Sequence, residues 1–131
     1  MPSSCVEVRR SYTPDEEVAI IDAVHEALVA AFGIPPQDKH VRLITHEPHR
    51  YSHPADLTDP DRYTLVTIDC FTGRSVDAKR ELYRGIVTRL AALGIPADHV
   101  TILLREGARE NWGIRGGQAA CDLELGSRVR A

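Results

Sequence analysis

The pattern of apolar and polar positions repeats once along the chain, so that two stretches show the same succession of expected elements. Each stretch has a short β-rich run, then apolar residues at helical spacing, then a second β-rich run. The first stretch covers about residues 2–47 and the second about residues 63–105. The four expected strands are Ser3–Val8, Val41–Thr45, Tyr63–Phe71 and Val100–Leu104.

Each stretch predicts one helix between its strands. Thr13, Pro14 and Glu16 have the spacing of a capping box with proline at the first helical position, and Gly33 ends this first helix. Its expected apolar stripe is Val18, Ile21, Val24, Leu28 and Phe32. Ser75 is the expected N-cap of the second helix, which should run to about residue 93. Its expected stripe is Leu82, Ile86, Leu90 and Leu93.

The segments that follow the two helices share a motif, Gly-Ile-Pro, which begins at Gly33 and again at Gly94. The chain therefore reads as a repeat of one strand–helix–strand unit. Two such units predict an α/β fold, a four-stranded sheet with both helices on one face and right-handed crossovers. We expect a single domain over residues 1–131, with a polar C-terminal tail at 106–131.

Length, composition and charge argue against several classes of protein. The length of 131 residues fits one domain, and a net charge of −3 gives no electrostatic case for a nucleic acid or an anionic membrane as partner. Three cysteines without zinc-type spacing do not predict a disulfide framework. The polar first residues do not resemble a signal peptide and no stretch suits a membrane span, so the expected location is cytoplasmic.

Pro2 is the candidate for chemistry. A proline after an initiator methionine usually leaves that methionine open to removal, and the chain would then begin with a secondary amine. In an apolar pocket, or near other cations, such an amine loses its proton more readily. Pro2 is then a candidate general base or nucleophile. The alternative is an inert strand residue, or one blocked by a retained Met1.

Five segments together resemble the tautomerase superfamily, and most closely the branch that contains malonate semialdehyde decarboxylase. They are Met1–Pro2, Ile21–His25, Phe32–Asp38, Gly73–Arg80 and Glu110–Gly113. The resemblance implies a homotrimer, with sites at subunit interfaces and Pro2 as the catalytic residue. It also implies that Pro2 works with Asp38 and with two arginines just before the second helix. Arg74 matches one of these arginines, and Thr72 stands at the position of the other.

The presence of Thr72 in place of an arginine affects which reaction is expected. Two arginines can hold a carboxylate and also polarise a second oxygen, whereas one does only one of these tasks well. The missing arginine therefore argues against decarboxylation or dehalogenation. Arg74 remains a candidate to bind a substrate carboxylate. Phe71 and Trp112 are candidates for substrate binding, with a subunit interface as the alternative place for Trp112.

The other polar candidates have plain structural interpretations. Asp38 is either functional or a turn residue, because Asp98 holds the same place in the second repeat. His25 is expected to be structural or exposed. The loop at 46–53 is rich in histidine, but Pro48 breaks any helical ligand spacing. We expect neither a metal nor a cofactor, and a loop that lines a pocket mouth is favoured there.

These patterns favour a cofactor-independent tautomerase. Pro2 would move a proton between carbon and oxygen of a small 2-oxo acid such as phenylpyruvate, while Arg74 holds its carboxylate. One alternative is an enzyme like malonate semialdehyde decarboxylase, a hydratase or a dehalogenase. The other is a trimeric binding protein without turnover.

Overall fold

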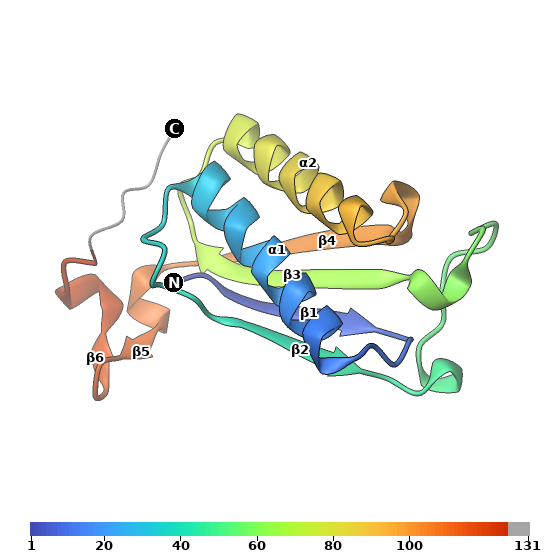
Figure 1. The fold of residues 1–131 in the computed structure, drawn as a ribbon. Helices are drawn as coiled ribbons and strands as arrows, with labels where there is room; N and C mark the ends of the chain where they lie inside the picture. The colour runs from blue at the N-terminus through green and yellow to red at the C-terminus, as the bar shows by residue number, and fades with distance from the viewer. Residues whose placement is uncertain (126–131) are drawn as a thin grey trace.

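Two helices lie side by side on one face of a four-stranded sheet in the computed structural model, which describes residues 1–125 (Figure 1). The helices are α1 (Pro14–Phe32) and α2 (Val76–Ala92). The strands are β1 (Ser3–Val8), β2 (Val41–Thr45), β3 (Thr64–Phe71) and β4 (Val100–Gly107). The predicted fold class is confirmed.

The strands are ordered β2-β1-β3-β4, parallel within each unit and antiparallel where β1 meets β3. Ser4 pairs with Val41, so β1 and β2 begin at the same end of the sheet. Ser3 pairs with Asp69, so β3 finishes at that end too. Three segments far apart in sequence therefore meet at the N-terminus.

Local signals set the helix ends as expected. The Thr13 hydroxyl accepts from the Glu16 amide at 3.2 Å, and the Glu16 carboxylate accepts from the Thr13 amide at 3.0 Å. Gly33 ends α1 in the left-handed region, at φ 64°. The Ser75 hydroxyl accepts from the Ala78 amide at 3.1 Å and caps α2.

The expected apolar stripes need three corrections, the first of which is that Ile21 is only half-buried and lies outside the core. Val18 is 56% exposed, because it lies about 200° around the helix from the buried Ile20. Leu93 is 39% exposed, because it follows the last helical residue of α2. The buried face of α1 includes several small residues that a search for large apolar side chains passes over. It consists of Ile20, Ala23, Val24, His25, Ala27, Leu28, Ala31 and Phe32.

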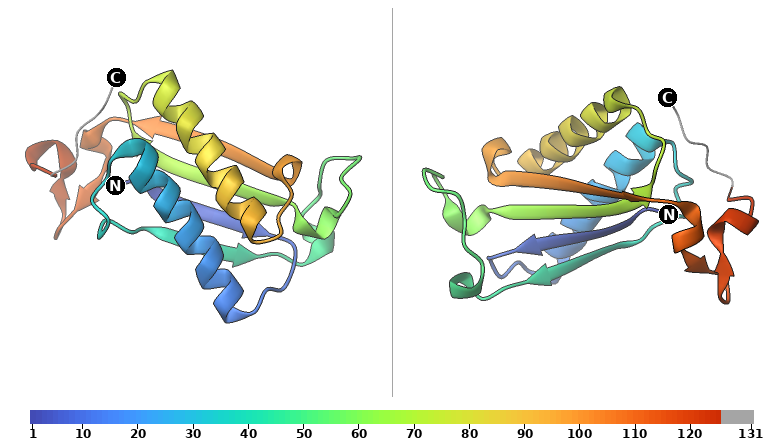
Figure 2. Two further views of the ribbon diagram at one scale, coloured as in Figure 1. Left: turned by 45° about the horizontal axis from the view of Figure 1, so that its top comes forward. Right: turned by 180° about the vertical axis from the view of Figure 1, so that it is seen from behind.

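Residues 106–125 contain more regular structure than the expected polar tail. Strand β4 continues to Gly107, and a small antiparallel sheet follows, formed by β5 (Gly113–Ile114) and β6 (Gln118–Ala119). Figures 1 and 2 show this small sheet at the same end of the molecule as the N-terminus. Neither helix is long and apolar enough to cross a bilayer, as judged within residues 1–125.

Candidate functional site

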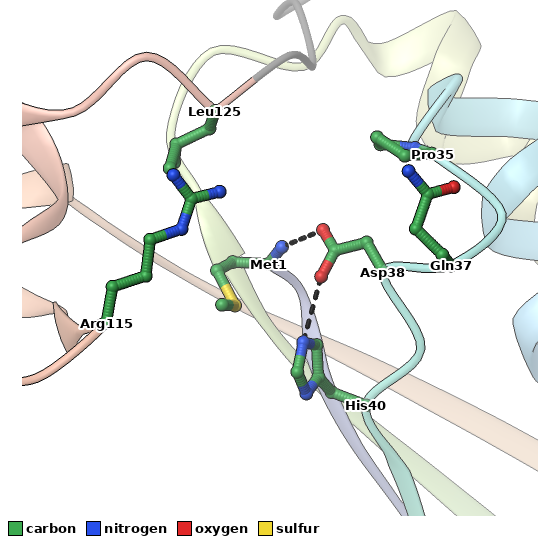
Figure 3. A pocket seen from close by; sticks show the side chains of 7 residues that line it. All are labelled: Met1, Pro35, Gln37, Asp38, His40, Arg115 and Leu125. Carbon is green, nitrogen blue, oxygen red and sulfur yellow. Dashed lines mark hydrogen bonds and ion pairs between the residues drawn. The ribbon is translucent and has the colours of Figure 1, made fainter.

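A cavity of about 270 Å³ opens at the N-terminus (Figure 3). Three parts of the chain supply its lining: the first residue, the segment between α1 and β2, and the region after β4. The lining residues are Met1, Pro35, Gln37, Asp38, His40, Arg115 and Leu125.

Asp38 connects two other groups of this cavity. One carboxylate oxygen forms an ion pair with the Met1 amino group, and the other lies 2.8 Å from His40 Nε2 (Figure 3). The Asp38 side chain is 20% exposed, so solvent screens these contacts less than it screens a surface pair. The carboxylate therefore stabilises positive charge at the amino terminus.

The loop that carries Asp38 is held from three sides. The Asp38 amide donates to the Pro35 carbonyl at 2.9 Å, which makes a turn. The Ser4 amide donates to the His40 carbonyl at 2.8 Å and ties the loop to β1. The buried His25 of α1 places Nε2 2.7 Å from the Pro36 carbonyl. His25 thus has the structural place that the sequence suggests.

Pro2 is buried behind Met1 and does not line the cavity itself. With Met1 attached, its nitrogen belongs to a peptide bond and carries no basic lone pair. The fold nevertheless brings the two predicted residues Pro2 and Asp38 together, since the residue bonded to Pro2 pairs with Asp38.

Arg74 points elsewhere within the chain. Its guanidinium donates to the Phe32 carbonyl at 2.5 Å and lies 4.6 Å from the centroid of the Phe32 ring. A cation at the last carbonyls of a helix is favourable, because the negative end of the helix dipole lies there. Arg74 is not among the residues that line the cavity at Met1.

Phe71 and Trp112 contact each other rather than this cavity. Their ring centroids are 5.3 Å apart in an edge-to-face arrangement, and the Arg109 guanidinium lies 5.0 Å from the Phe71 ring centroid. Trp112 lines a second, open cavity of about 400 Å³, together with Ser3 and Cys70. Because Met1 lines one cavity and Ser3 the other, Pro2 lies between them.

Sequence reasoning missed several residues of the first cavity, above all His40 and Arg115. His40 follows Asp38 by two positions just before a strand, so the alternation of side chains along extended backbone could have indicated it. Nothing local indicates Arg115, because its approach to Met1 depends on the course of the chain after β4.

The histidine-rich loop lies at the other end of the sheet, away from the N-terminus (Figure 1). Within the chain it does not line the cavity at Met1, contrary to the expectation of a pocket mouth. His46 Nε2 is 2.8 Å from Glu7 Oε1, and its ring stacks on Tyr51 at a centroid distance of 5.2 Å. No group of three or more His, Cys, Asp or Glu side chains within residues 1–125 is arranged to hold a metal ion.

Comparison with known proteins finds one matching family and several solved structures with a similar fold. The family described as "Tautomerase enzyme" matches residues 38–115, a segment that begins and ends with residues of the cavity. FG41 malonate semialdehyde decarboxylase, solved with 3-bromopropiolate as inhibitor, is 26% identical with a TM-score of 0.79, over 89% of this chain and 92% of that one.

Two further structures extend the likeness. A malonate semialdehyde decarboxylase, solved in wild-type, mutant and inactivated forms to explain its decarboxylase and hydratase activities, is 25% identical with a TM-score of 0.82. That match covers 93% of this chain and 99% of that one. The Q0 fused 4-OT, a symmetric trimer, is 26% identical with a TM-score of 0.70, over 95% of this chain and 98% of that one.

Proposed function

The chain belongs to the tautomerase enzyme family, and on this premise we propose that it is a cofactor-independent enzyme in which Pro2 transfers a proton within a small 2-oxo acid. The observation that carries the proposal is the contact between the terminal amino group and Asp38 in the cavity. Removal of Met1 would leave the secondary amine of Pro2 as the terminal group beside the same carboxylate.

The proposed step moves one proton. The neutral Pro2 amine takes a proton from the carbon next to the substrate carbonyl; the electrons of that C–H bond form the C=C bond, and the carbonyl oxygen becomes an enolate. The resulting ammonium then gives the proton to this oxygen, which yields the enol. Asp38 stabilises the ammonium between the two transfers.

We also propose a homotrimer. The sheet face that the helices leave open carries exposed apolar side chains, among them Ile44 at 42% and Leu103 at 51%. Exposed apolar side chains on one sheet face favour burial against another subunit. The trimeric Q0 fused 4-OT supports the same assembly for this chain. All three cysteines are free thiols, which supports a cytoplasmic location.

The test is the interconversion of enol and keto phenylpyruvate by protein whose intact mass shows loss of Met1. We expect Pro2→Ala, which replaces the ring-held secondary amine by a primary amine, to lower the rate at least about 100-fold. Pro54→Ala, in the exposed loop at the far end of the sheet, is the matched control and should keep the wild-type rate. Equal rates for Pro2→Ala and wild type would contradict the proposal.

Decarboxylation of a 3-oxo acid is the second candidate, because the terminal amino group forms an ion pair with the Asp38 carboxylate. A terminal ammonium can hold the carbonyl oxygen while the C–C bond to the carboxylate breaks, so that CO₂ leaves and the enolate takes up a proton. The two decarboxylases of 25% and 26% identity support this candidate, and Thr72 argues against it. Product analysis with malonate semialdehyde separates the two reactions, since only decarboxylation releases CO₂.

A chain that keeps Met1 would fit the remaining alternative, a binding protein without turnover. The Pro2 nitrogen is then an amide and cannot accept a proton. Intact mass and the phenylpyruvate assay together distinguish this case.

A further inference from the structure

We propose that Arg115 binds the substrate carboxylate in the cavity at Met1, an assignment that rests on the proposed function only for the substrate being a small carboxylate. Its side chain reaches from the turn between β5 and β6 into the cavity, across from Gln37 and Asp38 (Figure 3). It brings a guanidinium into the cavity where the amino terminus lies.

The contacts of the charged groups favour Arg115 for this task. Both oxygens of Asp38 are engaged, one by the Met1 amino group and one by His40. Arg74 is held by the carbonyl and the ring of Phe32. The Arg115 guanidinium makes no hydrogen bond or ion pair with any residue in the range 1–125, so its five N–H donors can meet a ligand.

The backbone at Arg115 is an independent indication. Arg115 has φ 50°, in the left-handed region, and Gly116 and Gly117 follow with φ 85° and 89°. The turn is held by Gln118 Nε2, which donates to the Arg115 carbonyl at 2.8 Å. Glycine would suit all three positions without strain. A long charged side chain at a backbone position that favours glycine, next to a cavity, points to a role for that side chain.

The charges that line the cavity indicate a carboxylate as the ligand. The amino terminus and Asp38 neutralise each other, which leaves the Arg115 guanidinium as positive charge facing the cavity. A guanidinium binds a carboxylate with two parallel hydrogen bonds. A carboxylate there lies next to the terminal amine, where a short 2-oxo or 3-oxo acid would present its reacting carbons. Arg115 would thereby supply at this cavity the guanidinium that neither Thr72 nor Arg74 brings to its lining.

Steady-state kinetics with three variants tests the assignment. Arg115→Gly removes the side chain and suits the backbone, Arg115→Asn tolerates the left-handed region, and Arg115→Lys keeps the charge without the planar fork. We expect KM for phenylpyruvate to rise at least about tenfold in the Gly and Asn variants, as loss of a charge-assisted contact does, and less in the Lys variant.

Two controls separate binding from structure. The rate with the methyl ester of phenylpyruvate, which carries no carboxylate, should not change in Arg115→Gly, and its melting temperature should not fall. Arg50→Gln makes the same change in net charge just beyond the end of β2, at the end of the sheet opposite the N-terminus, and should keep the wild-type KM. An unchanged KM for the acid in Arg115→Gly, or an equal loss for acid and ester, would overturn the assignment.

Malonate binding, measured by calorimetry, tests the assignment of Arg115 independently of the proposed reaction. If the wild type does not convert phenylpyruvate but binds malonate, and Arg115→Gly does not, the proposed reaction fails and the assignment of Arg115 stands. Equal malonate binding by the two proteins, or none by either, would overturn the assignment.

Discussion

The Met1 amino group pairs with the Asp38 carboxylate, and the same carboxylate contacts the His40 imidazole. The pairing of β1 with β2 produces this relationship, because it sets the first residues of the chain beside the segment that leads into β2. A charged terminus is therefore held at a cavity, and removal of one residue would replace its primary amine by the secondary amine of Pro2.

Activity should depend on removal of Met1. In preparations that contain both forms, we expect the rate per chain to rise in proportion to the fraction that intact mass shows without Met1, because only that fraction has a basic Pro2 nitrogen. Separated chains that keep Met1 should be folded by circular dichroism and inactive. Full activity in such chains would show that Pro2 is not the base.

Asp38→Asn should lower turnover at least about tenfold, because the amide keeps the shape of the side chain but cannot stabilise the protonated amine. The measurement is kcat for phenylpyruvate as a function of pH. Asp98→Asn changes the equivalent aspartate of the second repeat, whose carboxylate lies 2.7 Å from His99 Nδ1, and should keep wild-type kcat. The same loss in both variants would mean that Asp38 acts only in folding.

His25→Leu should lower the free energy of unfolding by about 1–3 kcal/mol, because the Pro36 carbonyl loses its partner in a partly buried place. It should also lower kcat, since this contact holds the loop that presents Asp38. Urea unfolding and the phenylpyruvate assay measure the two effects. His25→Gln can donate to the same carbonyl and should recover part of both; an identical loss in His25→Gln would argue against the contact with Pro36.

Alkaline pH should destabilise the fold partly through Cys70. Burial, followed by the negative charge of Glu106, raises the pKa of the Cys70 thiol from 9.0 to about 11. Between these values the unfolded chain loses this proton while the folded chain keeps it, so stability falls as pH rises. We expect Cys70→Ser to make the fall in urea midpoint between pH 9 and 11 shallower. Cys121→Ser, at an exposed position, should leave it unchanged, and equal slopes for all three proteins would contradict this role.

Short-range signals account for what the sequence predicted well. The capping box at Thr13, the left-handed Gly33 and the cap at Ser75 depend on contacts within a few residues, and all three are confirmed. The predictions of buried residues that were wrong depend instead on tertiary structure. Val18 and Leu93 are expected in the core because they are large and apolar. Val18 is exposed because the buried face of α1 points the other way, and Leu93 is exposed because it lies beyond the last residue of α2.

By itself, the sequence determined the two strand–helix–strand units and their helix ends. The resemblance to a family added Pro2 and Asp38 as candidate site residues. Tertiary structure alone decided that Met1, Asp38 and Arg115 share one cavity, that Arg74 turns to Phe32, and that Phe71 packs on Trp112. The physical reason is that strand pairing and the path of the chain after β4 bring together residues whose separation along the sequence carries no local signal.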